Sequence, residues 1–175
     1  MITIGFGGHG MAEELAAIVN AAYDTGEVGI WLAGWQRTTP EAYEKLIEAG
    51  EVAVASRDGT PIGCVRVRRL DEDTAELGML SVAPQAHGDG IGRALIAFAE
   101  NAFPVSTMQL ELLVPRGAPH PAKLRLHEWY SRIGYREIGR RDFSEPLLAA
   151  PADMVTYGKS LRAAPATDAP PRAPT

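Results

Sequence analysis

Apolar residues recur at helical spacing in four segments of the chain. The clearest segment covers residues 91–103, where they form one continuous stripe before Pro104 interrupts the pattern. Shorter stripes predict helices over residues 12–23, 40–50 and 121–134. Thr39 followed by Pro40 is typical of a helix start, and Gly50 is typical of a helix end. The pattern therefore predicts four helices.

Short apolar or alternating segments between these helices predict strands. The turn at residues 57–60, Arg-Asp-Gly-Thr, is typical of a hairpin. The predicted strands cover residues 2–6, 52–56, 62–69, 75–82, 108–114, 135–141 and 154–161. The order is a strand, two helices, three strands, a helix, a strand, a helix and two strands.

The connection after strand 75–82 carries three closely spaced glycines, Gly88, Gly90 and Gly92, and a helix opens directly after it. The first N–H groups of a helix have no internal partner, and the helix dipole adds positive charge there. Glycines keep side chains away from a ligand and permit positive φ. This arrangement predicts a phosphate or diphosphate site, the alternative being an ordinary tight connection.

Composition narrows the class of protein. The 175 residues are 46% hydrophobic and 22% charged, which is ordinary for one globular domain. No apolar run is long enough to span a membrane, and the N-terminus lacks a secretory signal. The single cysteine, Cys64, fits a reducing cytoplasm, and the net charge of −5 argues against nucleic acid as a partner. The Ala/Pro-rich tail, residues 163–175, is expected to be disordered.

Two motifs resemble those of one family. Residues 82–95, Val-Ala-Pro-Gln-Ala-His-Gly-Asp-Gly-Ile-Gly-Arg-Ala-Leu, resemble the acetyl-CoA-binding motif of the GNAT acyltransferase superfamily. His87 stands where that family usually has Arg or Gln. Residues 129–135, Trp-Tyr-Ser-Arg-Ile-Gly-Tyr, resemble a second GNAT element. The resemblance covers residues 1–162, and it implies an α/β (α+β) fold with a mixed, mostly antiparallel sheet of six or seven strands and about four helices.

The resemblance implies an N-acetyltransferase that moves an acetyl group from acetyl-CoA to a primary amine through a tetrahedral intermediate. A bulge in strand 75–82 is expected to free backbone groups for the pantetheine arm. The implied cofactor-binding residues are Met79, Leu80, Ser81, Val82, His87, Gly88, Asp89, Gly90, Ile91, Gly92, Arg93, Lys123 and Tyr130.

Catalytic roles follow from the same resemblance. Tyr130 matches the tyrosine that protonates the leaving thiolate, although spacing alone fits a core aromatic. Glu76 is the candidate base, against a solvated charge or a water chain, and strand alternation places it on one face with Gly78 and Leu80. The N–H of Leu80 is the expected oxyanion donor. Lys123 replaces a frequent asparagine, and it either reaches a phosphate or acidic group or is a plain surface lysine.

The acceptor pocket of this fold is lined by two loops, which here offer Trp31, Trp35, Arg37, Arg116 and His120. An arginine can hold a carboxylate with two hydrogen bonds, which favours an amino acid or a similar small amine as acceptor. The alternatives are that the tryptophans only pack the loop, that the enzyme acetylates a protein N-terminus or lysine, or that the domain senses acyl-CoA without turnover. No metal site is predicted, and a cytoplasmic, bacterial enzyme, in the form of a homodimer, is expected.

Overall fold

The computed structural model describes residues 1–161, so the predicted tail lies outside the described residues. It contains the predicted elements in the predicted order. The helices are α1 (Ala12–Gly26), α2 (Pro40–Glu48), α3 (Ile91–Glu100) and α4 (Pro121–Arg132), with one short 3-10 turn at Pro84–Ala86. The strands are β1 (Ile2–Phe6), β2 (Val52–Arg57), β3 (Thr60–Arg69), β4 (Thr74–Val82), β5 (Thr107–Pro115), β6 (Arg136–Phe143) and β7 (Ala152–Ser160).

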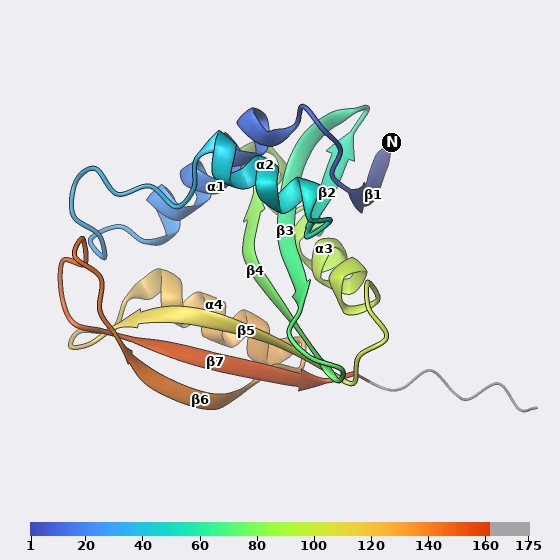
Figure 1. Cartoon of the computed structure of the whole chain (residues 1–175). Coiled ribbons are helices and arrows are strands. Elements are labelled where there is room, and N and C mark those ends of the chain that lie inside the picture. Colours follow the sequence, from blue (N-terminus) through green and yellow to red (C-terminus); the bar gives the residue numbers. More distant parts are fainter. Residues whose placement is uncertain (162–175) are drawn as a thin grey trace, which may run out of the picture.

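The strands form one seven-stranded sheet in the order β1-β2-β3-β4-β5-β7-β6. All neighbours are antiparallel except β4 and β5, which are parallel. This parallel pair is joined only where residues 74–76 face residues 107–109, and the strands then diverge. Figure 1 shows the resulting wedge between the two halves of the sheet. The predicted mixed, mostly antiparallel sheet with four helices is confirmed.

A bulge interrupts β4 beside the wedge. Ser81 pairs with Cys64 and Gly78 pairs with Arg66, so Met79 and Leu80 together oppose a single residue of β3. Met79 has a φ of +48°, which is rare for a residue other than glycine. The strand therefore changes face at this point. The prediction that Glu76, Gly78 and Leu80 share one face is wrong, because it assumed an unbroken alternation.

Each face of the sheet carries its own core. One core joins α1 and α2 to the sheet and includes Val19, Tyr43 and Met79. The other core includes residues of α3 and α4, among them Leu95 and Tyr130. Met79 belongs to the first core, whereas Leu80, its neighbour across the bulge, packs against the second. Both cores thus reach the wedge.

Gly63 of β3 sets how closely α3 approaches the sheet. A Cβ at Gly63 would lie 2.9 Å from the Ser81 carbonyl oxygen and 3.3 Å from side-chain atoms of Ile91 and Leu95. Only a residue without a side chain fits there, so the start of α3 is held against the end of β4. Over residues 1–161, the structure has no helix that is both long and apolar enough to cross a bilayer.

Candidate active site

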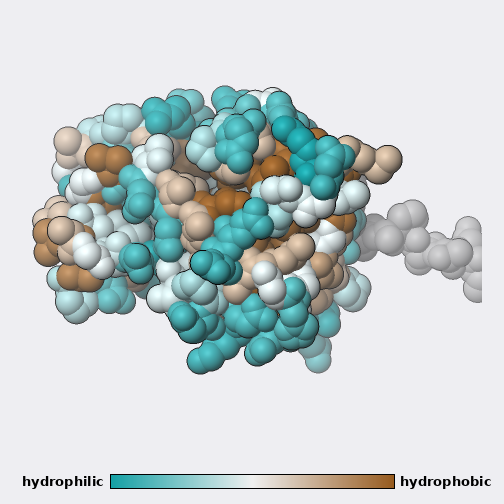
Figure 2. All heavy atoms as spheres, turned by 90° about the horizontal axis from the view of Figure 1, so that it is seen from above, coloured by the Kyte–Doolittle hydropathy of each residue, from teal (hydrophilic) through white to brown (hydrophobic). Residues whose placement is uncertain are grey.

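A cavity of about 1450 Å³ occupies the wedge between β4 and β5. Its wall comes from the end of α1, the α1–α2 loop, β4 from Leu77 onward, the glycine turn, β5 and α4. Figure 2 shows hydrophobic atoms at the bottom of a recess in the surface, surrounded by hydrophilic side chains. The cavity brings the two sequence motifs and the α1–α2 loop to one continuous space.

The glycine turn lies at one end of this cavity. Gly88 and Gly90 have φ of +88° and +77°, and Gly90 is the N-cap of α3. A Cβ at either position would meet no atom within 4 Å, so both face open space. His87 Nε2 lies 2.8 Å from the Val82 carbonyl oxygen and ties the turn to the end of β4. Positive φ together with open space is the geometry that an anion-binding turn requires.

Not every predicted cofactor-binding side chain faces the cavity. Nine of the thirteen line it, namely Met79, Leu80, Ser81, Val82, His87, Gly88, Gly92, Lys123 and Tyr130. Asp89 instead pairs with Arg57, at 2.5 Å between Nη2 and Oδ2. Ile91 is buried in the core, and Arg93 is exposed outside the cavity wall. For Asp89, Gly90, Ile91 and Arg93, only the backbone N–H groups remain candidates for diphosphate binding, because Gly90 has no side chain and the other three side chains do not line the cavity.

Tyr130 lies on the last turn of α4 and is 4% exposed. Its ring packs edge-on against Trp129 and Tyr135, with ring centres 5.0 and 5.7 Å away. Burial raises the pKa of Tyr130, so the phenol stays protonated. Within residues 1–161, its hydroxyl forms no hydrogen bond with another protein group, although Tyr130 lines the cavity. The ring of Trp129 lies 3.7 Å from the Cβ position of Gly92, which places the end of α4 beside the glycine turn.

Glu76 lies where β4 and β5 are still paired, and it does not line the cavity. Arg68 donates two hydrogen bonds to Glu76 Oε1, at 3.1 and 2.8 Å. Gln109 donates to Glu76 Oε2 at 3.1 Å. Because both carboxylate oxygens are engaged outside the cavity, the structure does not support Glu76 as the catalytic base.

Three of the five residues predicted to bind the acceptor line the cavity, and two do not. Trp31, Trp35 and Arg37 line the cavity. The two tryptophan rings are stacked, 4.1 Å apart and 3° from parallel. The Arg37 guanidinium lies 5.2 Å from the ring centre of Tyr23, an α1 residue that also lines the cavity. Burial raises the pKa of the Tyr23 hydroxyl above its usual value, and the positive charge of Arg37 lowers that pKa and offsets part of the increase.

Arg116 and His120 do not reach the cavity, which corrects the prediction for both. Arg116 forms ion pairs with Asp142 and Asp153, the latter at 2.5 Å. His120 Nε2 lies 2.9 Å from the Val28 carbonyl oxygen and fastens the α1–α2 loop to the start of α4. Sequence reasoning placed these residues on the correct loop but could not identify their partners.

Sequence reasoning named Lys123 but missed Glu27 and the buried ion pair that the two residues form. Glu27 and Lys123 form an ion pair in which each side chain is 7% exposed, and both line the cavity. The indole N–H of Trp31 donates to the second oxygen of Glu27 at 2.5 Å. Lys123 is therefore not a plain surface lysine, because its ammonium is buried against Glu27 and borders the cavity. Glu27 stands 96 positions from Lys123, so no local signal could have paired them.

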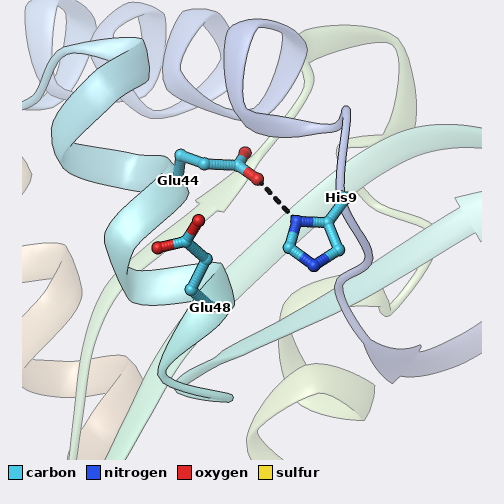
Figure 3. A group of neighbouring side chains, drawn as sticks. All are labelled: His9, Glu44 and Glu48. Carbon is cyan, nitrogen blue, oxygen red and sulfur yellow. Dashed lines mark hydrogen bonds and ion pairs between the residues drawn. The ribbon is translucent and has the colours of Figure 1, made fainter.

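A second polar group lies outside the cavity. His9, from the β1–α1 loop, points toward Glu44 and Glu48 of α2 (Figure 3). His9 Nδ1 is 3.0 Å from Glu44 Oε1, and the ligand-type atoms of the three residues lie within 4.8 Å of one another. His9 and Glu48 are exposed to solvent. The sequence did not predict this cluster, because its members come from two separate elements.

Residues 48–137, just over half of the chain, match the sequence model of the acetyltransferase (GNAT) domain. The chain belongs to the GNAT family. It is therefore an N-acetyltransferase by family, with acetyl-CoA as the usual co-substrate. A comparison with curated protein sequences finds no match.

Solved structures share the GNAT fold over nearly the whole chain. The PaiA N-acetyltransferase from Thermoplasma acidophilum in complex with coenzyme A has a TM-score of 0.71 and 17% identity, covering 92% of this chain and 99% of its own. The ribosomal-protein-S18-alanine N-acetyltransferase from Escherichia coli has a TM-score of 0.66 and 16% identity, covering 97% and 99%.

The N-acetylglutamate synthase from Neisseria gonorrhoeae, complexed with coenzyme A and N-acetyl-glutamate, has a TM-score of 0.62 and 20% identity. The match covers 93% of this chain but 35% of the synthase, so this GNAT chain spans about a third of that protein. Identities this low establish the fold and leave the acceptor open.

The cavity of this GNAT enzyme fits coenzyme A. The turn at Gly88 and Gly90 leaves open space where side chains would otherwise lie, and the unpaired edge of β4 borders the same cavity. The diphosphate would be held by the N–H groups of the turn, and the pantetheine arm by residues 79–82.

Proposed function

We propose that this enzyme acetylates the primary amine of a small molecule that also bears a carboxylate, such as an amino acid. The observation that supports it best is the single cavity, which joins the glycine turn, Tyr130, the stacked tryptophans and Arg37. A cofactor end and an acceptor end thus open into one space of about 1450 Å³. A cytoplasmic location and a homodimer stay predictions from the sequence.

Acetyl-CoA supplies the thioester whose carbonyl carbon the neutral amine attacks. In this proposal the N–H of Leu80, one of the two bulged residues of β4, donates to the carbonyl oxygen as negative charge develops on it. As the carbon–sulfur bond breaks, the departing sulfur takes the proton of Tyr130, the attacking nitrogen gives up a proton to water, and solvent returns a proton to the phenolate. The raised pKa of Tyr130 keeps that proton in place over the working pH range, and its hydroxyl has no competing protein partner within residues 1–161.

The covered acceptor end favours a small acceptor. The α1–α2 loop pairs with the β6–β7 loop, where the Leu32 N–H donates to the Leu147 carbonyl at 2.8 Å. The Ala149 N–H donates to the Ile30 carbonyl at 2.9 Å. These contacts join the two loops beside the cavity (Figure 1), which narrows the space that an acceptor can enter.

The experiment is a thiol-release assay with acetyl-CoA and a panel of amines. The panel contains α-amino acids, the same compounds without the carboxylate, and a peptide with a free N-terminus. Faster release with the amino acids than with their decarboxylated forms supports the proposal. Release with the peptide alone identifies a protein N-terminal acetyltransferase. Tight coenzyme A binding without release from any amine identifies a non-catalytic sensor.

A further inference from the structure

The buried pair formed by Glu27 and Lys123 joins the two halves of the split sheet. Glu27 ends α1, which packs on the β1–β4 half, and Lys123 lies in the first turn of α4, which follows β5. Both side chains line the cavity at its acceptor end, next to Trp31. The enzyme thus places one negative and one positive group in contact inside an aromatic pocket.

Stability does not explain this pair well. Removing two charges from water carries a large desolvation penalty, which their mutual attraction often fails to recover. Apolar residues of similar volume frequently stabilise such a position better. The surroundings are apolar, since the stacked rings of Trp31 and Trp35 and the ring of Phe143 lie on the same wall. A binding role accounts for charges that packing does not need.

Both groups keep unused hydrogen-bonding capacity. An ammonium has three N–H donors, and in the described part of the chain Lys123 donates only to Glu27. A carboxylate accepts about four hydrogen bonds, and Glu27 receives one from Lys123 and one from Trp31. At 7% exposure, little solvent reaches the remaining donors and acceptors, which border the cavity.

A ligand that satisfies both groups at once must carry an ion pair of reversed polarity and similar short spacing. An α-amino acid has this form, since one carbon separates its ammonium from its carboxylate. When an α-amino acid lies antiparallel to the Glu27–Lys123 pair, its ammonium faces the carboxylate of Glu27 and its carboxylate faces the ammonium of Lys123. An amine without a carboxylate satisfies Glu27 only, and an ω-amino acid separates its charges too widely.

We propose that Glu27 and Lys123 form a subsite for the zwitterionic head of an α-amino acid, with Lys123 holding the carboxylate and Glu27 the ammonium. This inference rests on the proposed function and names its substrate class. The stacked tryptophans provide an apolar wall for the side chain of the amino acid.

The subsite lies in the same cavity as Tyr130. Lys123 and Tyr130 are seven residues apart on α4, which places them on one face at about 10 Å along the helix axis. Tyr23 lies one turn before Glu27 on α1 and lines the same cavity as Tyr130. The subsite and the phenol therefore border the same cavity, and the bound ammonium gives up a proton to water before its nitrogen attacks the thioester.

Direct binding tests the subsite without turnover. The ligands are L-phenylalanine and L-methionine, with phenethylamine and 3-phenylpropanoate as forms that lack one charge. Isothermal titration is carried out with the coenzyme A-saturated enzyme, and tryptophan fluorescence reports on Trp31. Binding of the amino acids at least about tenfold tighter than that of either single-charge form is expected, since each lost charged hydrogen bond is worth this much. Equal binding of all four, or no binding of either amino acid, overturns the proposal.

Substitutions then assign the two charges. Lys123→Met should remove at least about tenfold of the preference for L-phenylalanine over phenethylamine, because Glu27 still accepts the ammonium of both while the carboxylate loses its partner. The double variant E27Q/K123M removes both charges and avoids a buried unpaired one. It should abolish the preference for the zwitterion. Lys45→Met, on the exposed face of α2, is the matched control.

An unchanged preference in the folded double variant shows that the pair is structural, and overturns the inference. Thiol release with the amine panel is measured separately on the same proteins. Release with the peptide alone refutes the proposed function, whereas release from small amines with no role for the pair refutes only the subsite.

Discussion

A carboxylate placed on the glycine turn should weaken coenzyme A binding, and the structure provides a matched control. Gly88 lines the cavity with a φ of +88°, and a Cβ there meets no atom within 4 Å. Gly50, at the end of α2, has a φ of +69° and equally open space, but it does not line the cavity. Gly88→Asp and Gly50→Asp therefore introduce the same side chain in the same backbone conformation, at different places.

The magnitude follows from the charge and the strain. Each substitution forces an L-residue into the left-handed region at about 1 kcal/mol, which lowers the melting temperature by about 2–4 °C. A carboxylate about 5 Å from a phosphate charge adds a repulsion of about 1–3 kcal/mol for effective dielectric constants between 80 and 20. This repulsion applies to Gly88→Asp alone and raises the Kd of coenzyme A by about 5- to 150-fold.

The assay is isothermal titration of coenzyme A into each variant, with thermal unfolding of the same samples. Both variants should lose similar stability, and only Gly88→Asp should lose affinity. The loss should shrink at high salt, because salt screens the repulsion between exposed charges. If Gly88→Asp binds coenzyme A as tightly as Gly50→Asp at low salt, the turn does not hold the diphosphate.

Three further predictions concern Tyr130, the buried ion pair and the cysteine. Tyr130→Phe should lower kcat by about 10²-fold or more, while the Kd of coenzyme A changes little. The control is Tyr157→Phe, which removes a hydroxyl that contacts His127 outside the cavity and should leave kcat unchanged. Equal kcat values for the two variants would remove Tyr130 from the mechanism. Lys123→Met should lower the free energy of unfolding in urea by about 3–5 kcal/mol, because it leaves Glu27 buried and unpaired, whereas E27Q/K123M should recover most of this loss. A loss in the double variant as large as in the single one would contradict that reason. Burial raises the pKa of the Cys64 thiol to about 11, so it should react with a thiol reagent at pH 8 only in denaturant; rapid labelling of the native enzyme would show that Cys64 is accessible.

The sequence predicted those features of the fold whose signals are local. Helical spacing of apolar residues gave all four helices, and the hairpin turn placed β2 beside β3. Thr39 does cap α2, accepting a hydrogen bond from the Ala42 N–H at 3.2 Å. These signals work because a helix, a cap or a tight turn is decided by residues a few positions apart.

In the candidate site, too, the sequence predicted the residues that belong to short motifs and failed for those whose role depends on distant partners. Tyr130 and the glycine turn were found because each lies within a short motif, and the structure brings both to one cavity. Glu76 was assigned on its position in a strand, but whether a carboxylate is free depends on side chains from β3 and β5. Arg116 failed in the same way, since its acidic partners follow it by 26 and 37 positions.

Taken by itself, the sequence determined the family, the order of elements and the position of the glycine turn, because short-range spacing and backbone conformation suffice for each. Tertiary structure alone decided which charges face the cavity. Glu27 meets Lys123 only after β4 and β5 separate and α1 reaches across the wedge to α4. A buried charge takes its chemistry from its neighbours, and those neighbours are set by packing over the whole domain.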